Sequence, residues 1–193
     1  MREILFFSNN KGKIKEISDL LKKHSFKVLS LNNFKGKYDV QENGNSFSEN
    51  AKKKSMFGFE KFNIPCISDD SGICFEALNW KPGIHSKRFL KSFKNDKDCF
   101  NYILETASRK SKLKAYFKSS ISYTYKKNYH IIFEGRVDGT VSNKILGKEG
   151  FGYDPIFIPN GHTKTFGEIK ENQKNKISHR SIAVNKLIGF LIN

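Results

Sequence analysis

The chain has 193 residues, of which 37% are hydrophobic and 13% aromatic, so it can bury one substantial core. Its 35 lysines and arginines against 19 aspartates and glutamates give a net charge of +16, which attracts polyanions of any kind. The basic residues are spread along the chain, which argues against a dedicated nucleic-acid-binding protein. The first apolar run, residues 4–7, is too short for a signal-peptide core, and no run reaches the ~18 apolar residues of a membrane span. We therefore expect a soluble, intracellular protein.

Three cysteines, Cys66, Cys74 and Cys99, are an odd number and show no CxxC spacing. They fall in stretches that have the pattern of a strand or a helix. We expect them to be buried and reduced.

In chain order, the predicted elements begin with a strand at residues 2–7 and an amphipathic helix at residues 11–24, whose apolar residues recur at helical spacing. A second helix begins at the capping-box pattern Ser46-Phe47-Ser48-Glu49 and continues towards Phe59. The polar segment between the first strand and the first helix therefore lies at a strand-to-helix turn.

A short strand at residues 66–67 is predicted to end at Ser68-Asp69-Asp70-Ser71-Gly72, and an extended pattern resumes at residues 73–75. Serine, aspartate and glycine are typical turn residues. We therefore expect the acidic pair to lie on a loop at the edge of a strand.

The second half of the chain contains a predicted helix at residues 96–108 and a predicted hairpin of residues 114–125 and 129–137. A brief strand at residues 156–158 and a helix at residues 178–191 complete it. Helices that alternate with strands, together with one hairpin, predict an α/β protein with a mixed sheet.

Two regions carry oxygen ligands or phosphate-binding groups. The turn Ser8-Asn9-Asn10-Lys11-Gly12-Lys13 offers backbone N–H groups, a helix dipole and two lysines to an anionic phosphate, or it is an ordinary helix cap. Asp69 and Asp70 are suited to magnesium ligation or to activation of a water, unless they only complete a turn. Glu42 is either a further metal ligand or a surface glutamate.

The C-terminal part offers groups that suit a base. Phe151-Gly152-Tyr153-Asp154 combines two aromatic faces, a flexible glycine and a carboxylate, all of which a purine pocket uses and a core beside a turn also contains. Ser178-His179-Arg180, with Lys174 before it, could hold phosphate or base oxygens, or simply begin a helix.

Taken together and in order, these blocks resemble the inosine triphosphate pyrophosphatase family. The blocks are Ser8 to Lys13, Glu42 to Gly44 with Ser46 to Ala51, Ser68 to Gly72, Phe151 to Pro155 and Ser178 to Arg180, with Pro82 to Phe89 as a sixth. Two departures stand out: Ser8-Asn9-Asn10 replaces the family's Thr-Gly-Asn, and Lys87 replaces a small residue. Asparagine tolerates left-handed backbone better than most residues, so we expect Asn9 to keep the turn.

The resemblance implies a single catalytic domain, residues 1–193, with an elongated mixed β-sheet, flanking helices and two lobes with the active cleft between them. It also implies a cytoplasmic homodimer. The implied activity is magnesium-dependent hydrolysis of non-canonical purine nucleoside triphosphates (ITP, dITP, XTP) to the monophosphate and pyrophosphate, in nucleotide-pool sanitation. The sequence does not rank these substrates.

The resemblance also assigns roles to residues. Asp70 is implied as proton acceptor and, with Glu42, as magnesium ligand, and Lys13 as a catalytic residue that holds the triphosphate. Asp69 is a less certain partner in metal binding. The implied substrate-binding residues are Ser8, Asn9, Asn10, Lys11, Gly12, Lys13, Lys54, Ser71, Phe151, Gly152, Tyr153, Asp154, Lys174, His179 and Arg180.

Two other functions compete with this one. A related pyrophosphatase for a modified pyrimidine nucleotide would keep the phosphate and metal residues, but Phe151 to Asp154 and His179-Arg180 count against it. A basic nucleic-acid-binding protein would make the +16 charge the function itself and would bind duplexes in a steeply salt-dependent way.

Overall fold

The computed structural model describes residues 2–192, which form two compact units. Unit 1 takes its described residues from Met1–Asp70, Ser119–Gly135 and Arg180–Asn193, and unit 2 comprises Ser71–Lys118 and Arg136–His179. Each unit therefore combines segments that lie far apart in the sequence.

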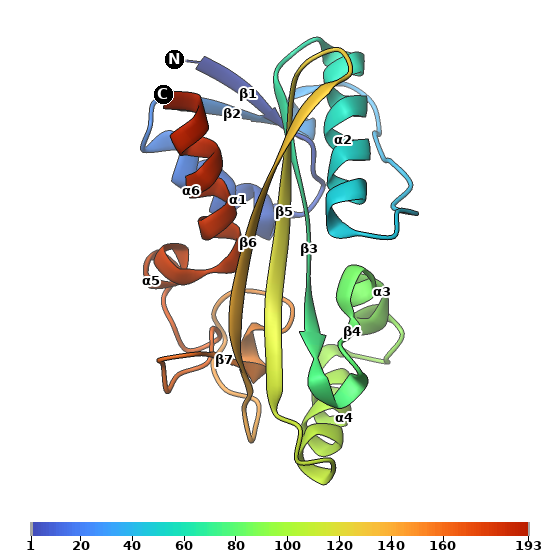
Figure 1. The fold of residues 1–193 in the computed structure, drawn as a ribbon, viewed down its shortest axis with the longest axis vertical. Helices are drawn as coiled ribbons and strands as arrows, with labels where there is room; N and C mark the ends of the chain where they lie inside the picture. The colour runs from blue at the N-terminus through green and yellow to red at the C-terminus, as the bar shows by residue number, and fades with distance from the viewer. Residues whose placement is uncertain (1, 193) are drawn as a thin grey trace. The chain divides into compact units, whose positions relative to one another are not determined.

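In unit 1, the first two strands and the first half of the third pair in parallel. β1 (Arg2–Phe6) lies between β2 (Phe26–Ser30) and β3 (Cys66–Phe75) (Figure 1). Parallel neighbours need a crossover connection, and these are supplied by α1 (Lys11–Lys22) and α2 (Phe47–Phe62). The strand predicted at residues 2–7 and both predicted helices are confirmed.

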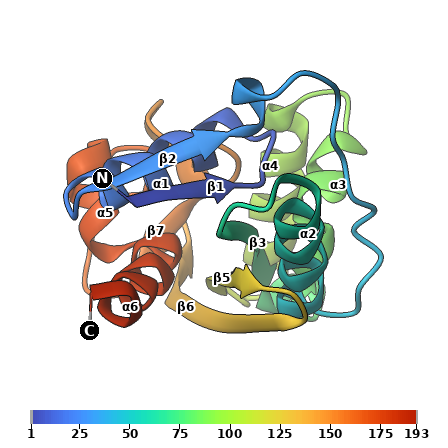
Figure 2. The same ribbon diagram turned by 90° about the horizontal axis from the view of Figure 1, so that it is seen from above.

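Alternating residues of β1, together with Phe7 directly after it, pack into two separate cores. Ile4 and Phe6 pack with α1 and α6 (His179–Ile192), whereas Leu5 and Phe7 pack on the side of α2. Figure 2 shows α6 and α2 apart from each other, with strands between them. The strand is apolar at successive positions because both faces of the sheet are covered by helices.

The predicted hairpin is confirmed. β5 (Lys114–Lys126) and β6 (Tyr129–Val141) are neighbours in the sheet and are joined by only two residues. Asn128 takes a positive φ of 63° at this turn, a conformation that asparagine tolerates. The strand order β2-β1-β3-β5-β6 thus combines parallel and antiparallel pairs, which confirms the mixed α/β fold.

Unit 2 adds two short antiparallel strands to β3 and β6. β4 (Lys81–Pro82) pairs with β3, and β7 (Phe157–Pro159) pairs with β6. α3 (Ser86–Lys91), α4 (Asp96–Arg109) and α5 (Glu171–Ile177) are its helices. Short 3-10 turns occur in both units, at Leu31–Asn33, Glu76–Leu78, Gly83–His85 and Asp154–Ile156.

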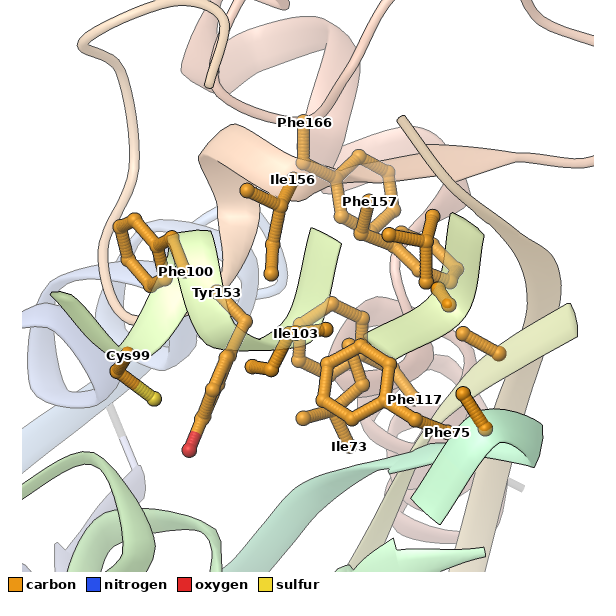
Figure 3. Close-up of a cluster of buried hydrophobic side chains, with 14 of the residues drawn as sticks. Ile73, Phe75, Cys99, Phe100, Ile103, Phe117, Tyr153, Ile156, Phe157 and Phe166 are labelled. Carbon is orange, nitrogen blue, oxygen red and sulfur yellow. The ribbon is translucent and has the colours of Figure 1, made fainter. Parts of the chain in front are cut away.

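The core of unit 2 is rich in aromatic rings. Figure 3 shows Tyr153, Phe100 and Phe157 among the buried side chains of this cluster. The inner side of α4 contributes Cys99 and Ile103. The helix predicted at residues 96–108 is confirmed, and the side chain of Asn95 caps its start.

Sequence patterns missed four short elements. β2, β4, α3 and α5 have 5, 2, 6 and 7 residues, so each offers little of a repeating pattern. Of the strand predicted at residues 156–158, residue 156 belongs to the 3-10 turn Asp154–Ile156 and residues 157 and 158 belong to β7. The helix predicted at residues 178–191 corresponds to α6.

The cysteines match their prediction, because Cys66, Cys74 and Cys99 are all buried and free. Burial raises the pKa of the Cys99 thiol to about 11, which keeps it protonated at neutral pH. Within residues 2–192, no helix has both the length and the apolar character needed to cross a membrane.

Gly72→Ala is expected to destabilise unit 2 by about 1–3 kcal/mol. A Cβ at this position would lie 2.2 Å from the Gly83 carbonyl oxygen and 2.4 Å from Ser86 Oγ. Urea unfolding followed by circular dichroism measures the loss. Gly189→Ala is the control, because its Cβ meets nothing within 4 Å in a helix, where alanine is favoured. Equal stability of the two variants would contradict the prediction.

Candidate active site

The turn after β1 is organised by its own side chains. Asn10 is the N-cap of α1, and its Oδ1 accepts a hydrogen bond from the Lys13 backbone N–H at 3.1 Å. Ser8 Oγ accepts another from the Asn10 N–H at 3.2 Å. Lys11 is exposed, whereas Gly12 is half-buried. Because the first N–H groups of a helix point out of it and the helix dipole is positive there, this turn suits a phosphate.

Asn9 holds the turn differently from the expectation. Asn9 is not among the described residues with positive φ, so the expectation of a left-handed conformation at Asn9 is wrong. Instead, its side-chain amide donates to the Tyr38 carbonyl at 3.0 Å and ties the turn to a neighbouring segment. Because Asn9 is not among the residues with positive φ, glycine is dispensable at this position.

Asp69 and Asp70 lie inside a strand, because β3 continues unbroken from Cys66 to Phe75. The loop predicted at residues 68–72 is therefore wrong. Turn-type residues remain in a buried strand when each polar group has a partner. Here the carboxylates have such partners, described below.

Asp69 is held by two cations and a hydroxyl. Its Oδ2 lies 2.8 Å from Lys13 Nζ and 3.2 Å from Arg180 Nε, and its Oδ1 accepts a hydrogen bond from Ser119 Oγ at 2.6 Å. Burial by itself would raise the pKa of Asp69, but the Lys13 and Arg180 charges outweigh it and hold the pKa well below the usual range. Asp69 is therefore ionised and acts only as an acceptor.

Asp70 has fewer partners. Its Oδ2 accepts a hydrogen bond from the Asn50 amide at 3.0 Å, and Lys54 Nζ lies 4.0 Å from its Oδ1. Asn50 is oriented by the Gly44 N–H, which donates to the amide oxygen at 2.8 Å. Burial raises the pKa of Asp70, and nearby Glu42 acts in the same direction. Of the two carboxyls, Asp70 is thus the one suited to accept a proton.

Glu42 and Asp70 share the ammonium of Lys54. Lys54 Nζ donates to Glu42 Oε1 at 2.6 Å and to the Asp69 carbonyl at 2.8 Å. Two carboxylates on either side of one cation are a suitable oxygen donor set for Mg²⁺, which usually takes one or two carboxylates and completes its shell with water and substrate phosphates. Across residues 2–192 no group of three or more His, Cys, Asp and Glu forms a protein-only metal site.

Arg180 and Glu16 complete the charged cluster of unit 1, which we define as Lys13, Glu16, Glu42, Lys54, Asp69, Asp70 and Arg180. The Arg180 side chain is 2% exposed and is paired with Glu16 as well as Asp69. Asp69 and Glu16 raise the pKa of Arg180 against the effect of burial, so it stays charged. The contact of Arg180 with a base stays a prediction.

Sequence patterns missed Glu16, although a signal existed. Glu16 lies in the buried stripe of α1 beside Ile17 and Leu20. A glutamate on the apolar face of a helix is almost never buried without a partner. It could have been paired with a buried cation, but not with Arg180 in particular.

In unit 2, Lys174 and Asp154 form a buried ion pair. Lys174 Nζ lies 2.6 Å from Asp154 Oδ2, and both side chains are 3% exposed. The same oxygen accepts the Phe151 backbone N–H at 2.8 Å, and Lys174 Nζ lies 4.8 Å from the Phe151 ring centroid. The pair fixes the segment that was predicted to bind a base.

The other predicted substrate-binding residues of unit 2 differ in their contacts and burial. Tyr153 is part of the core, where its hydroxyl donates to the Ser86 carbonyl at 2.8 Å (Figure 3). His179 stacks on Phe117 with ring centroids 4.6 Å apart. Gly152 adopts a positive φ of 61°, which favours glycine. Ser71 is half-buried in β3. Their contacts with substrate stay predictions.

Known proteins are similar to this chain along nearly its whole length. The model of the Ham1 family matches residues 4–190. The chain belongs to the Ham1 family. Among its relatives, the dITP/XTP pyrophosphatase of Porphyromonas gingivalis is 36% identical over 193 residues, covering 100% of this chain and 98% of that protein. The dITP/XTP pyrophosphatase of Leptospira interrogans is 38% identical over 194 residues, covering 98% and 97%.

Solved structures of the Ham1 family agree with this fold. The Ham1 protein of Staphylococcus aureus is 35% identical, with a TM-score of 0.86 and 98% of each chain covered. The HAM1 protein of Coxiella burnetii is 33% identical, with a TM-score of 0.88 and coverage of 100% of this chain and 99% of that one. The predicted resemblance is thereby confirmed.

Proposed function

We propose that this Ham1-family chain hydrolyses non-canonical purine nucleoside triphosphates, such as dITP, ITP and XTP, to the monophosphate and pyrophosphate. The observation that carries the proposal is the charged cluster of unit 1. In it Asp70, the carboxyl with the raised pKa, lies 4.0 Å from the ammonium of the buried Lys54. The neighbouring residue Asp69 is ion-paired with Lys13. The names of the relatives, dITP/XTP pyrophosphatases, support the same substrates.

The triphosphate is held by cations and by a helix N-terminus. Lys13 lies in the first turn of α1, and Ser8 and Asn10 shape the preceding turn, whose N–H groups would bind an anion. Lys54 adds a second ammonium close to Asp70. These charges offset the negative charge that builds up on the phosphates during cleavage.

Asp70 accepts the proton from the attacking water. The water attacks the α-phosphorus in line, and pyrophosphate leaves from the opposite side without a covalent enzyme intermediate. Asn50 orients the Asp70 carboxylate, and burial keeps it basic enough for this task. Asp69 is ion-paired with Lys13 and Arg180, so Asp70 and not Asp69 accepts the proton.

The activity depends on Mg²⁺, which Glu42 and Asp70 would hold. A Mg²⁺ ion held by these residues would offset the negative charge of the phosphates and act as a Lewis acid. Both carboxylates already lie around one cation, Lys54, so they can take a second cation once the substrate brings its negative charges.

The base is recognised by residues of unit 2. A 6-keto purine accepts hydrogen bonds where adenine presents an amino group, so buried donors such as Lys174 and His179 discriminate strongly between them. Asp154 positions Lys174 for this role. We also propose that the enzyme is cytoplasmic and works as a homodimer in nucleotide-pool sanitation.

The test is pyrophosphate release from the triphosphates of inosine, deoxyinosine, xanthosine, adenosine, guanosine, cytidine and uridine, with Mg²⁺ and with a chelator. Turnover of the inosine and xanthosine nucleotides that the chelator abolishes is the expected result. Equal rates for all bases would contradict the proposed base recognition. Turnover of pyrimidine nucleotides alone would favour a pyrophosphatase for a modified pyrimidine nucleotide. Duplex binding without turnover would favour a nucleic-acid-binding protein.

A further inference from the structure

Asp69 joins three other elements of unit 1 through one carboxylate. Its Oδ2 contacts Lys13 of α1 and Arg180 of α6, and its Oδ1 accepts a hydrogen bond from Ser119 of β5. The Asp69 side chain is fully buried, and the Lys13 side chain is only 14% exposed. The position of the Lys13 ammonium therefore depends on this carboxylate.

We propose that Asp69 is a positioning residue, which holds the Lys13 ammonium in place for the triphosphate and takes no part in proton transfer. This inference rests on the proposed function. It assigns different tasks to two adjacent aspartates of one strand, with Asp70 acting on the water and Asp69 acting through Lys13.

The charge balance around Lys13 supports this division. Burial lowers the pKa of Lys13, and the charges of Lys54 and Arg180 lower it further. The Asp69 carboxylate opposes this lowering most strongly, and Asp70 opposes it to a smaller extent. Of the two cations on Asp69, Arg180 cannot give up its proton under ordinary conditions, whereas a lysine can. If the carboxylate of Asp69 is removed, the remaining positive charges repel one another, and Lys13 is the group that loses its proton more easily.

Asp69→Asn should therefore change substrate binding in a pH-dependent way. Loss of an opposite charge in contact lowers the pKa of Lys13 by about 1–3 pH units. KM for the triphosphate rises, and the alkaline limb of kcat/KM moves to lower pH by the same amount. At the acid end of the profile, where Lys13 is still charged, kcat changes much less than KM.

The direct measurement is the titration of Lys13 by 13Cε NMR in the metal-free protein. Lys13→Arg identifies the signal by its disappearance. The expected result is a lower midpoint in Asp69→Asn than in the unaltered protein. Ser119→Ala is the matched control, because it removes the hydroxyl partner of Asp69 and leaves the carboxylate in contact with Lys13. Asp69→Glu restores the charge and should return the midpoint towards its original value.

A second variant tests the opposite sign and guards against misfolding of Asp69→Asn. Glu16→Gln/Arg180→Met removes the competing cation together with its other carboxylate, so Arg180 no longer competes with Lys13 for the Asp69 carboxylate. The Lys13 midpoint should then rise. Circular dichroism checks that each variant is folded.

Two outcomes would overturn the inference: a Lys13 midpoint that moves in neither variant, or a loss of kcat in folded Asp69→Asn that is equal at every pH. The second would place Asp69 in the chemical step. If the unaltered protein releases no pyrophosphate from any triphosphate, the proposed function fails, while the NMR midpoints still decide whether Asp69 controls Lys13.

Discussion

Asp70→Asn is expected to lower kcat for dITP hydrolysis by about 10²–10⁴-fold, the usual contribution of a general base. The amide has the shape of the carboxylate but cannot take a proton from water. It can still accept a hydrogen bond from Asn50, which donates to Asp70 at 3.0 Å, so the fold around β3 should persist. KM should change much less than kcat, because Lys13 and the N-terminus of α1 still hold the phosphates.

The measurement is steady-state pyrophosphate release with saturating Mg²⁺. Asp39→Asn is the matched control: it removes the same charge from an exposed position of unit 1, outside the charged cluster, and should leave kcat unchanged. If Asp70→Asn keeps more than about a tenth of the original kcat, Asp70 is not the general base.

Asp154→Asn is expected to lower the free energy of unfolding by about 3–5 kcal/mol, because it leaves a buried ammonium without its counter-charge. Lys174 Nζ lies 2.6 Å from Asp154 Oδ2, and neither side chain has more than 3% of its surface exposed. An amide oxygen at this position can accept a hydrogen bond from Lys174, but it carries no negative charge.

Urea unfolding followed by the fluorescence of Trp80, the single tryptophan, reports on unit 2, and circular dichroism gives a second probe. Asp138→Asn is the matched control in the same unit. Its ion pair with Arg136 is about half-exposed on both sides, so its loss should cost at most about 1 kcal/mol. Equal losses in the two variants would show that the Asp154–Lys174 pair is no more important than a surface pair.

Asp154→Asn/Lys174→Met separates the two causes of the loss. Removing both charges leaves no buried ion, so this double variant should recover most of the stability lost in Asp154→Asn. It should not recover the preference for 6-keto purines, because the proposed donor to the base is gone. Recovery of both properties would contradict the proposed role of Lys174.

The sequence by itself determined most of the helices and strands and the family. The apolar spacing of α1 and α4 and the capping pattern before α2 are local signals, each contained within a few turns of chain. The same is true of the hairpin of β5 and β6, whose turn and alternation lie in adjacent residues. The blocks that carry the family resemblance are likewise short and continuous.

Only the tertiary structure decided which partners each charged residue has. Ser68 to Gly72 has the composition of a turn, yet it stays in β3 because its polar groups meet partners from other elements. Asp69 and Asp70 are neighbours of the same type, so local composition and spacing could not tell them apart. Only the family resemblance singled out Asp70. Arg180, which fixes Asp69 in its ionised state, is 111 residues away in the chain. The protonation of a carboxyl depends on burial and on charges within a few ångströms, and those distances exist only once the chain has folded.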